Sequence, residues 1–278
     1  MERNTRAWLL AGGLIAAGLF LSAPSWFILW ILRTRPQLFL PDERIQAAVQ
    51  RALNADIHDL ELARHRKALL EAADFVDEHL AGRPGFSDRY QLLRHSLERV
   101  DPKIGGLYCE FGVGQGDSVN FIASVVPQQK LHGFDSFEGL PENWRDGHGK
   151  GTFKTSGLPR VLPNVVLHKG WFHESLPGFK QKHPEPAAFF HLDADLYSST
   201  KTVFDILGDQ VVAGSVLVFD EFIGYPGWRQ GEFRAFREFA EARGLEYEYL
   251  GYCQRGQQVA LRVIGTGRPG AREVRSGN

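Results

Sequence analysis

Cysteine is scarce in this sequence, which contains only Cys109 and Cys253 among its 278 residues. Two cysteines cannot form a disulfide framework, and nothing supports a single disulfide between them. Their spacing matches no zinc-binding pattern. An excess of charge is also missing, because 32 Lys and Arg residues are balanced by 33 Asp and Glu residues. Without a basic field, nucleic acid is not an expected partner. Internal repeats are absent too, which excludes a repeat architecture.

The overall composition is that of a globular protein. Hydrophobic residues make up 43% of the chain and charged residues 23%, which excludes a mainly disordered chain. The length fits one or two domains. Against this ordinary background one segment stands out, because no residue from Ala7 to Leu32 is charged.

This uncharged segment predicts a single-pass membrane anchor. About 20 apolar residues suffice to cross a bilayer, and arginines flank residues 7–32 on both sides. A signal peptide cleaved after Ala23 is the first alternative, and a buried or interfacial helix is the second. The chain stays apolar beyond Ala23, which favours a retained anchor. The arginines that follow the segment predict that the rest of the chain lies in the cytoplasm. Membrane association that resists carbonate extraction would support the predicted anchor.

Residues 36–102 are expected to form a helical stalk or cover between the anchor, residues 1–35, and the next domain. Apolar residues recur with a helical period from Asp42 to Leu80, and Arg89 to Val100 indicates a second, shorter helix. Asp42 is a plausible helix start and Gly82 a plausible stop.

Short apolar strands alternate with helices over residues 103–264, which predicts an α/β domain with a mostly parallel sheet. Only four residues separate the last two expected strands, so they should form a hairpin and give the sheet one antiparallel strand. Residues 265–278, rich in Gly and Arg, are expected to be a flexible tail. The expected strands cover residues 106–113, 130–135, 165–169, 187–193, 215–220, 246–252 and 257–263, and the expected helices cover residues 117–126, 198–210 and 230–243.

A glycine-rich turn follows the first of these strands. Gly112, Gly114 and Gly116 lie at alternate positions directly after Glu110. Glycine lets the backbone turn tightly and approach a ligand closely. The spacing is GxGxG, whereas dinucleotide sites carry GxGxxG, so a pyrophosphate ligand is not favoured. Glu110 would repel a phosphate but could hold a cationic group.

An acid at the end of the second strand completes a candidate donor site. Asp135 follows Glu110 by 25 residues, and an acid in that position can bind both hydroxyls of a ribose. S-Adenosylmethionine fits this pair of signals, because it has a ribose and a positive sulfonium but no phosphate.

Four further acids end two other strands. They are Asp193 and Asp195 after one strand and Asp220 and Glu221 after the next. Converging carboxylates repel one another unless a cation balances them, and oxygen ligands suit Mg²⁺, Mn²⁺ or Ca²⁺. Such an ion would lower the pKa of a substrate hydroxyl, and a neighbouring carboxylate would accept its proton. Helix capping by solvated acids is the alternative explanation.

Three motifs resemble the macrocin O-methyltransferase (TylF-like) family. They are GFDSFEGLPE at 133–142, LDADLYSST at 192–200 and VFDEFIGYPGW at 218–228. The resemblance implies a Rossmann-like class I methyltransferase fold, S-adenosylmethionine as donor, hydroxyls of sugars on larger scaffolds as acceptors, and a homo-oligomer. It also implies metal ligands at Asp193, Asp220 and Glu221, a general base at Asp195, and donor contacts from Glu110, Gly112, Gly114, Asp135 and Ser136.

Two further regions are expected to shape the site. Trp228 is interpreted as a platform for an acceptor sugar, with a packed turn as the alternative. The long stretch from Gly139 to Leu162 is expected to close over the donor. Within it His148 is an alternative base, although a loop histidine is more often solvated.

The sequence therefore predicts a membrane-anchored O-methyltransferase that uses S-adenosylmethionine and a divalent cation. A DxD glycosyltransferase is the main alternative, because an anchor, a stalk and the pair Asp193 and Asp195 fit that class equally well. The phosphate-free donor signature at Glu110 to Gly116 argues against it. A donor-binding scaffold without catalysis is the third alternative, and the retained acids argue against that.

Overall fold

The structure is a computed structural model that describes residues 30, 33–34, 59–267 and 272–273. The chain divides into two compact units, residues 1–64 and 65–278. Among the described residues, none of the helices combines the length and the apolar character that a bilayer crossing requires. The predicted anchor at 7–32 lies outside the described residues apart from Trp30, and therefore stays a prediction.

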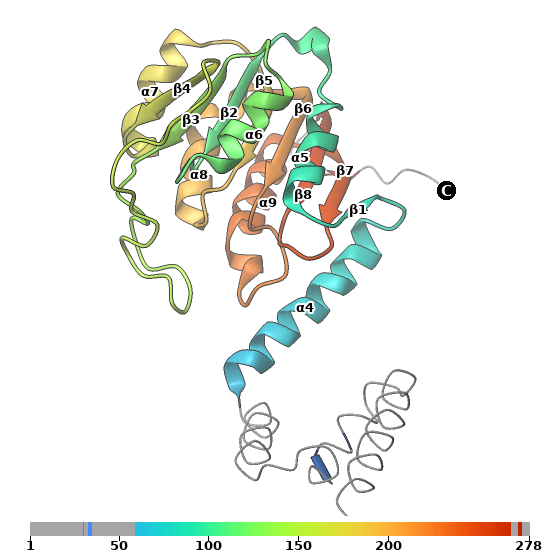
Figure 1. The fold of residues 1–278 in the computed structure, drawn as a ribbon. Helices are drawn as coiled ribbons and strands as arrows, with labels where there is room; N and C mark the ends of the chain where they lie inside the picture. The colour runs from blue at the N-terminus through green and yellow to red at the C-terminus, as the bar shows by residue number, and fades with distance from the viewer. Residues whose placement is uncertain (1–29, 31–32, 35–58, 268–271, 274–278) are drawn as a thin grey trace, which may run out of the picture. The chain divides into compact units, whose positions relative to one another are not determined.

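The second unit is built on a nine-stranded sheet with helices on both faces, as Figure 1 shows. The strands run in the order β4-β3-β2-β5-β6-β8-β7-β1, and β9 also pairs with β7. The strands are β1 (Gly85–Phe86), β2 (Leu107–Phe111), β3 (Leu131–Asp135), β4 (Val165–Lys169), β5 (Ala187–Leu192), β6 (Val211–Phe219), β7 (Leu245–Cys253), β8 (Val259–Thr266) and β9 (Arg272–Glu273). The helices are α4 (Leu60–His79), α5 (Arg89–Leu97), α6 (Asp117–Val125), α7 (Phe172–Lys182), α8 (Tyr197–Leu207) and α9 (Glu232–Arg243).

One strand runs against the others, as predicted. β8 is antiparallel to both β6 and β7, whereas the other described strand pairs are parallel. The short link between β7 and β8 allows only this hairpin arrangement. The predicted α/β fold with a mostly parallel sheet is confirmed. Two details differ from the prediction: helix α7 was not expected, and the expected flexible tail contributes Gly265 and Thr266 to β8 and residues 272–273 to β9.

The sheet has an apolar core on each face. α7, α8 and α9 cover one face, where Phe190, Phe219 and Phe236 are fully buried. α5 and α6 cover the other face through Leu92, Val119 and other apolar residues. The strands β2 and β5 are buried along their whole length, as expected for central parallel strands between two helical layers. Helix α5, which lies within the predicted stalk or cover at 36–102, therefore covers part of the sheet.

The edge of the sheet at β3 and β4 contains a buried histidine with a lowered pKa. His132 is 4% exposed, and its Nδ1 lies 3.0 Å from Nε2 of His168. Burial, together with the neighbouring His168 and His183, lowers the pKa of His132 to about 4. A ring held neutral in the folded state makes stability depend on pH.

We expect this histidine to destabilise the protein in acid. Between pH 6.5 and 4, His132 binds a proton in the unfolded chain but not in the folded chain. The free energy of unfolding therefore falls as the pH drops, by on the order of 2 kcal/mol. Urea denaturation at several pH values should show a smaller fall for His132→Leu than for the unsubstituted protein. Equal falls in both proteins would contradict the assignment.

Candidate active site

A cavity of about 820 Å³ opens at the carboxyl ends of the central strands. Its wall includes the turn after β2, the end of β3, the acids after β5 and β6, and part of the loop after β3. Ligands bind at this edge in open parallel sheets because the loops that follow neighbouring strands converge there. The predicted donor signature and the predicted acid cluster are thus brought to one cavity.

The glycine-rich turn is shaped by a close approach between two strand ends. Gly112 has a φ of 97°, and a Cβ atom there would lie 1.8 Å from the carbonyl oxygen of Asp193. Only glycine fits that position. Gly112 and Gly114 line the cavity, whereas Gly116 stands at the N-cap of α6 and is not part of the wall. The structure gives Gly116 a place at the helix start, and its predicted contact with the donor stays a prediction.

Asp135 fixes the turn through its carboxylate. Its Oδ2 accepts hydrogen bonds from the backbone N–H groups of Val113 (2.9 Å) and Gly114 (2.8 Å), and its Oδ1 accepts one from Phe137 (2.6 Å). Asp135 and Ser136 both line the cavity. The structure thus places them as the sequence predicts, and their contact with a ribose stays a prediction.

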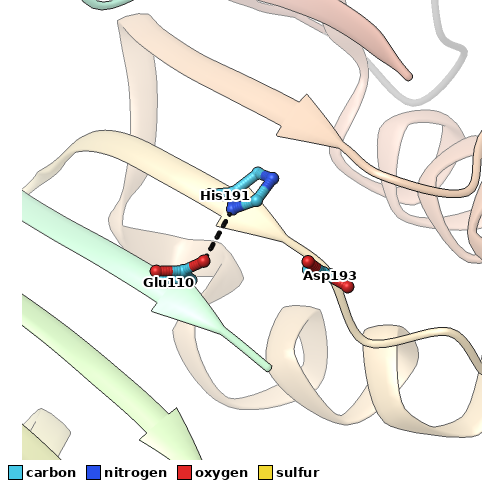
Figure 2. A group of neighbouring side chains, drawn as sticks. All are labelled: Glu110, His191 and Asp193. Atoms are coloured by element: carbon cyan, nitrogen blue, oxygen red, sulfur yellow. Dashed lines mark hydrogen bonds and ion pairs between the residues drawn. The ribbon is translucent and has the colours of Figure 1, made fainter. Parts of the chain in front are cut away.

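Glu110 is the predicted donor residue that the structure places differently. Its side chain is fully buried in β2, and its Oε1 lies 3.1 Å from Nδ1 of His191, as Figure 2 shows. Its other oxygen, Oε2, has no hydrogen-bond partner in the structure. Glu110 is absent from the cavity wall, but it lies beside the wall, because Glu110, His191 and Asp193 offer ligand atoms within 4.8 Å of one another.

His191 is a buried cation beneath the cavity. Its side chain is fully buried, and its Nε2 lies 3.8 Å from Oδ1 of Asp220. Burial favours the neutral ring, but the interactions with Asp220 and Glu110 outweigh burial and raise the pKa of His191 to about 10. The protonated ring therefore holds these two acids in place.

Asp193, Asp195 and Glu221 form a cluster of carboxylates. Each of them offers an oxygen within 4.8 Å of the others. Burial raises the pKa of Asp193 and of Glu221 well above its usual range, and repulsion by nearby acids adds to this effect. Oε2 of Glu221 is buried without a hydrogen-bond partner. A buried carboxylate oxygen without a partner indicates a missing cation or proton.

Asp195 has an unusual backbone for its residue type. Its φ is 60°, a left-handed conformation that costs a residue other than glycine about 1 kcal/mol or more. Burial raises the pKa of Asp195 to about 7, although Arg145 acts in the opposite direction. The side chain lines the cavity. Its predicted role as a base agrees with this position but is not tested by it.

Asp220 differs from the other predicted metal ligands because its carboxylate already contacts two positively charged side chains, Arg89 and His191. Nη1 of Arg89 lies 3.5 Å and 3.4 Å from its two carboxylate oxygens, and 3.8 Å from Oδ2 of Asp193. Burial raises the pKa of Asp220, but His191 and Arg89 outweigh burial, so that the pKa lies below its usual range. The structure therefore groups Asp195, rather than Asp220, with Asp193 and Glu221.

One acid of the site was not predicted from the sequence, and it joins the loops that follow β5 and β6. Glu232, from α9, is fully buried and accepts hydrogen bonds from the backbone N–H groups of Ala194 (3.1 Å) and Glu221 (3.1 Å) and from Oγ1 of Thr200 (3.2 Å). Burial raises the pKa of Glu232 to about 8 against the effect of those bonds. No local motif marks Glu232, because its partners lie after β5, after β6 and in α8.

The loop after β3 contributes part of the cavity wall. Its base is closed where the N–H of Leu140 donates to the carbonyl of Thr152 (2.8 Å) and that of Gly151 donates to the carbonyl of Leu140 (2.9 Å). Trp144 and Arg145 from this loop line the cavity, and the Arg145 guanidinium stacks 3.7 Å from the Trp144 ring centre. The predicted closure of the loop over a donor stays a prediction.

The predictions for Trp228 and for His148 need correction. Trp228 was expected to form an acceptor platform, but it is 1% exposed and packs edge-on against Phe75 and Phe233 in the core. Its sequence position after a strand gave no information about the direction of the side chain. His148 is half-buried against Trp144 and Phe153, does not line the cavity and contacts the carbonyl of Asp146, so it is not placed as a base.

Comparisons with known proteins agree on the class. Residues 109–222 match the methyltransferase-domain family Methyltransf_24. A 4'-O-methyltransferase of 8-demethyl-8-(2,3-dimethoxy-alpha-L-rhamnosyl)-tetracenomycin-C from Streptomyces olivaceus is 27% identical over 164 residues, which cover 48% of this chain and 60% of the relative. The chain thus matches less than two thirds of the length of that relative.

Among solved structures, CalS11, a calicheamicin methyltransferase, is similar with a TM-score of 0.52 and 24% identity. The similarity covers 72% of this chain and 90% of that one, and it shows a common fold. Residues 109–222 are thus similar to a methyltransferase domain, and the chain shares the fold of that solved methyltransferase. The narrower resemblance to the macrocin O-methyltransferases stays a prediction.

Proposed function

We propose that this protein is an S-adenosylmethionine-dependent O-methyltransferase that methylates a sugar hydroxyl of a glycosylated metabolite with the help of a divalent cation. The observation that carries the proposal is the cavity itself. Within a methyltransferase domain, it brings the glycine turn and Asp135 together with three clustered carboxylates, one of which has an oxygen without a partner.

The charge of the cavity supports a sulfonium donor over a nucleotide sugar. Seven acids line its wall and outnumber the four cations Arg89, Arg145, Lys150 and Lys154; the acids are Asp117, Asp135, Glu142, Asp193, Asp195, Asp220 and Glu221. Such a wall attracts a positive sulfonium and repels a diphosphate. The same argument weighs against the glycosyltransferase alternative.

The residues fit a hard divalent cation. Asp193, Asp195 and Glu221 offer only oxygen ligands, which Mg²⁺ and Mn²⁺ prefer, and Oε2 of Glu221 has no other partner. When bound, such an ion lowers the pKa of a coordinated acceptor hydroxyl. Asp193 and Glu221 would hold the ion, and Glu232 would keep the Glu221 backbone in place.

The chain's own groups would handle the proton and the alignment. Asp195 is our candidate for the group that accepts the proton of the hydroxyl, because its carboxylate lines the cavity beside Asp193 and Glu221. The turn at Gly112 would hold the donor against the strand ends. The loop around Trp144 would exclude water and align the acceptor oxygen with the donor methyl group.

A sugar is the proposed acceptor because of the relative from Streptomyces olivaceus, whose name describes methylation of a rhamnosyl group. Trp144 offers an aromatic surface on the cavity wall that suits the apolar face of a sugar ring. This side chain takes the role that the sequence analysis had assigned to Trp228.

Calorimetry and a methyl-transfer assay test the proposal. We expect the full chain to bind S-adenosylmethionine and not a UDP-sugar, and to transfer labelled methyl groups to sugar-containing acceptors in a cell extract. Asp193→Asn should remove the stimulation by Mg²⁺ while donor affinity changes little. Asp205→Asn is the matched control, because Asp205 contacts Lys201 on an exposed surface of α8.

Each part of the proposal can fail separately. Binding of UDP-sugars without S-adenosylmethionine would overturn the methyltransferase assignment. Methyl transfer that EDTA leaves unchanged would overturn the role of the metal alone.

A further inference from the structure

Two of the four cations on the cavity wall have acidic partners and two do not. Arg89 pairs with Asp220, and Lys154 pairs with a glutamate of its own loop. Arg145 and Lys150 form no ion pair within the described part of the chain. Acids outnumber cations on this wall by seven to four, and opposite charges attract one another. Two cations that stay apart from so many acids are free to meet the charge of a ligand.

Arg145 is held in place by contacts that leave its charge unbalanced. Its guanidinium stacks 3.7 Å from the ring centre of Trp144 and lies 5.1 Å from that of Tyr225. Its Nη1 donates to the neutral amide oxygen of Gln257 at 3.3 Å, which is its one hydrogen bond among the described residues. A guanidinium has five N–H donors in its plane, and stacking on a ring leaves the edge of that plane open. Arg145 is therefore a fixed donor group with unused hydrogen-bonding capacity.

The guanidinium lies beside the aromatic surface that is proposed above for the sugar. Trp144 precedes Arg145 in the loop after β3, and both side chains line the cavity. The loop turns back at this point through a bridge between Arg145 and His148, and Lys150 follows on the same wall. A group bound by Arg145 would thus belong to the sugar or lie next to it.

We propose that the acceptor sugar is acidic and carries a carboxylate that Arg145 binds, with Lys150 as a second positive charge on the same wall. The proposal rests on the methyltransferase function stated above and narrows its acceptor. The planar fork of a guanidinium matches the two oxygens of a carboxylate. A carboxylate also brings a single negative charge, so the acids of the cavity repel it less than they repel a diphosphate.

The charge of the methylated product tests the proposal before the acceptor is identified. The full chain is incubated with labelled S-adenosylmethionine and a cell extract, and the unreacted donor is removed. We expect an anion-exchange resin to retain the labelled product at neutral pH and to release it in strong acid, where a carboxylic acid is protonated. Carbodiimide coupling to methylamine, which turns the carboxylate into a neutral amide, should abolish retention.

Arg145→Met tests the residue itself. We expect the KM for the purified acceptor to rise at least about tenfold, because charge-assisted hydrogen bonds are lost, while donor affinity measured by calorimetry stays unchanged. Arg145→Lys should raise the KM less, because the charge is kept. Arg160→Met is the matched control, since Arg160 is an exposed residue of the same loop outside the cavity wall, and its KM should not change.

The amidated acceptor separates carboxylate binding from a disturbed loop. The unsubstituted protein should prefer the acidic acceptor over its neutral amide by at least about tenfold in kcat/KM, and Arg145→Met should lose that preference. A substitution that merely displaced Trp144 would weaken the use of both forms equally. An unchanged preference in Arg145→Met would therefore overturn the role of Arg145.

The remaining outcomes separate the acidic acceptor from the proposed function. A labelled product that the resin does not retain, or whose charge alkaline phosphatase removes, would overturn the carboxylate and leave the methyltransferase standing. The same holds for a product whose charge survives amidation. Absence of any labelled product would overturn the proposed function and, with it, the acidic acceptor.

Discussion

Gly112→Ala is expected to unfold the protein or to cost on the order of 3–5 kcal/mol of its stability. A Cβ atom at this position would lie 1.8 Å from the carbonyl oxygen of Asp193 and 2.8 Å from its carbonyl carbon. Both atoms belong to the backbone after β5, so no side-chain rotation can relieve the overlap. The ends of β2 and β5 would have to separate, and with them the two halves of the cavity.

Gly114→Ala provides the matched control, because it lies in the same turn two residues later. A Cβ atom there meets nothing within 4 Å, and the φ of 51° is a conformation that alanine adopts at a cost of about 1–2 kcal/mol. The variant should therefore fold. Because Gly114 lines the cavity, its new methyl group should nevertheless weaken the binding of S-adenosylmethionine.

Thermal denaturation and calorimetry together distinguish the two glycines. The first variant should lose structure, whereas the second should keep its structure and lose donor affinity. A stable Gly112→Ala protein with normal donor binding would contradict the geometry of the turn. A Gly114→Ala protein with normal donor affinity would contradict the proposed position of the donor.

The sheet could be predicted from the sequence because its signals are local. The predicted strand at 165–169 is identical to β4, and the other strand predictions differ from β2, β3 and β5 to β8 by one to four residues at their ends. Helix α7 was missed because Pro177 and Gly178 lie inside it. Both residues are typical of turns, and here the packing of Leu176 and Phe179 against the sheet outweighs their low helix propensity.

The candidate site could be predicted only in part, because the direction of each side chain and its hydrogen-bond and ion-pair partners depend on the folded chain. The positions of Asp135, Asp193, Asp195 and Glu221 at strand ends follow from their place after apolar runs, and the structure brings them to one cavity. The contacts of Arg89 do not follow from its sequence, since a helix start says nothing about which distant acid it meets.

Glu232 is a clear case of a residue that only the fold identifies. It lies in the first turn of α9, where an acid commonly interacts with the helix dipole. Nothing local distinguishes it from the exposed Glu238 on the same helix. Its importance comes from three donors that the folded chain directs at its carboxylate.

Glu232→Ala is expected to lower the free energy of unfolding by about 4 kcal/mol, because it leaves two buried backbone N–H groups without partners at about 1–3 kcal/mol each and also creates a cavity. The donors lost are the N–H groups of Ala194 and Glu221. Glu238→Ala is the control. Glu238 is 44% exposed and pairs with Arg234 at the surface, so its loss should cost less than about 1 kcal/mol.

Glu232→Gln separates the loss of the hydrogen bonds from the loss of volume. The amide keeps the shape of the side chain but places an N–H₂ group where one carboxylate oxygen now accepts a hydrogen bond, so a donor faces a donor. We expect Glu232→Gln to lower the free energy of unfolding, measured by urea denaturation, by less than Glu232→Ala and by more than Glu238→Ala. Because one displaced partner is the backbone of Glu221, Mn²⁺ affinity should fall as well. A variant that keeps both stability and Mn²⁺ affinity would show that Glu232 does not position the carboxylate cluster.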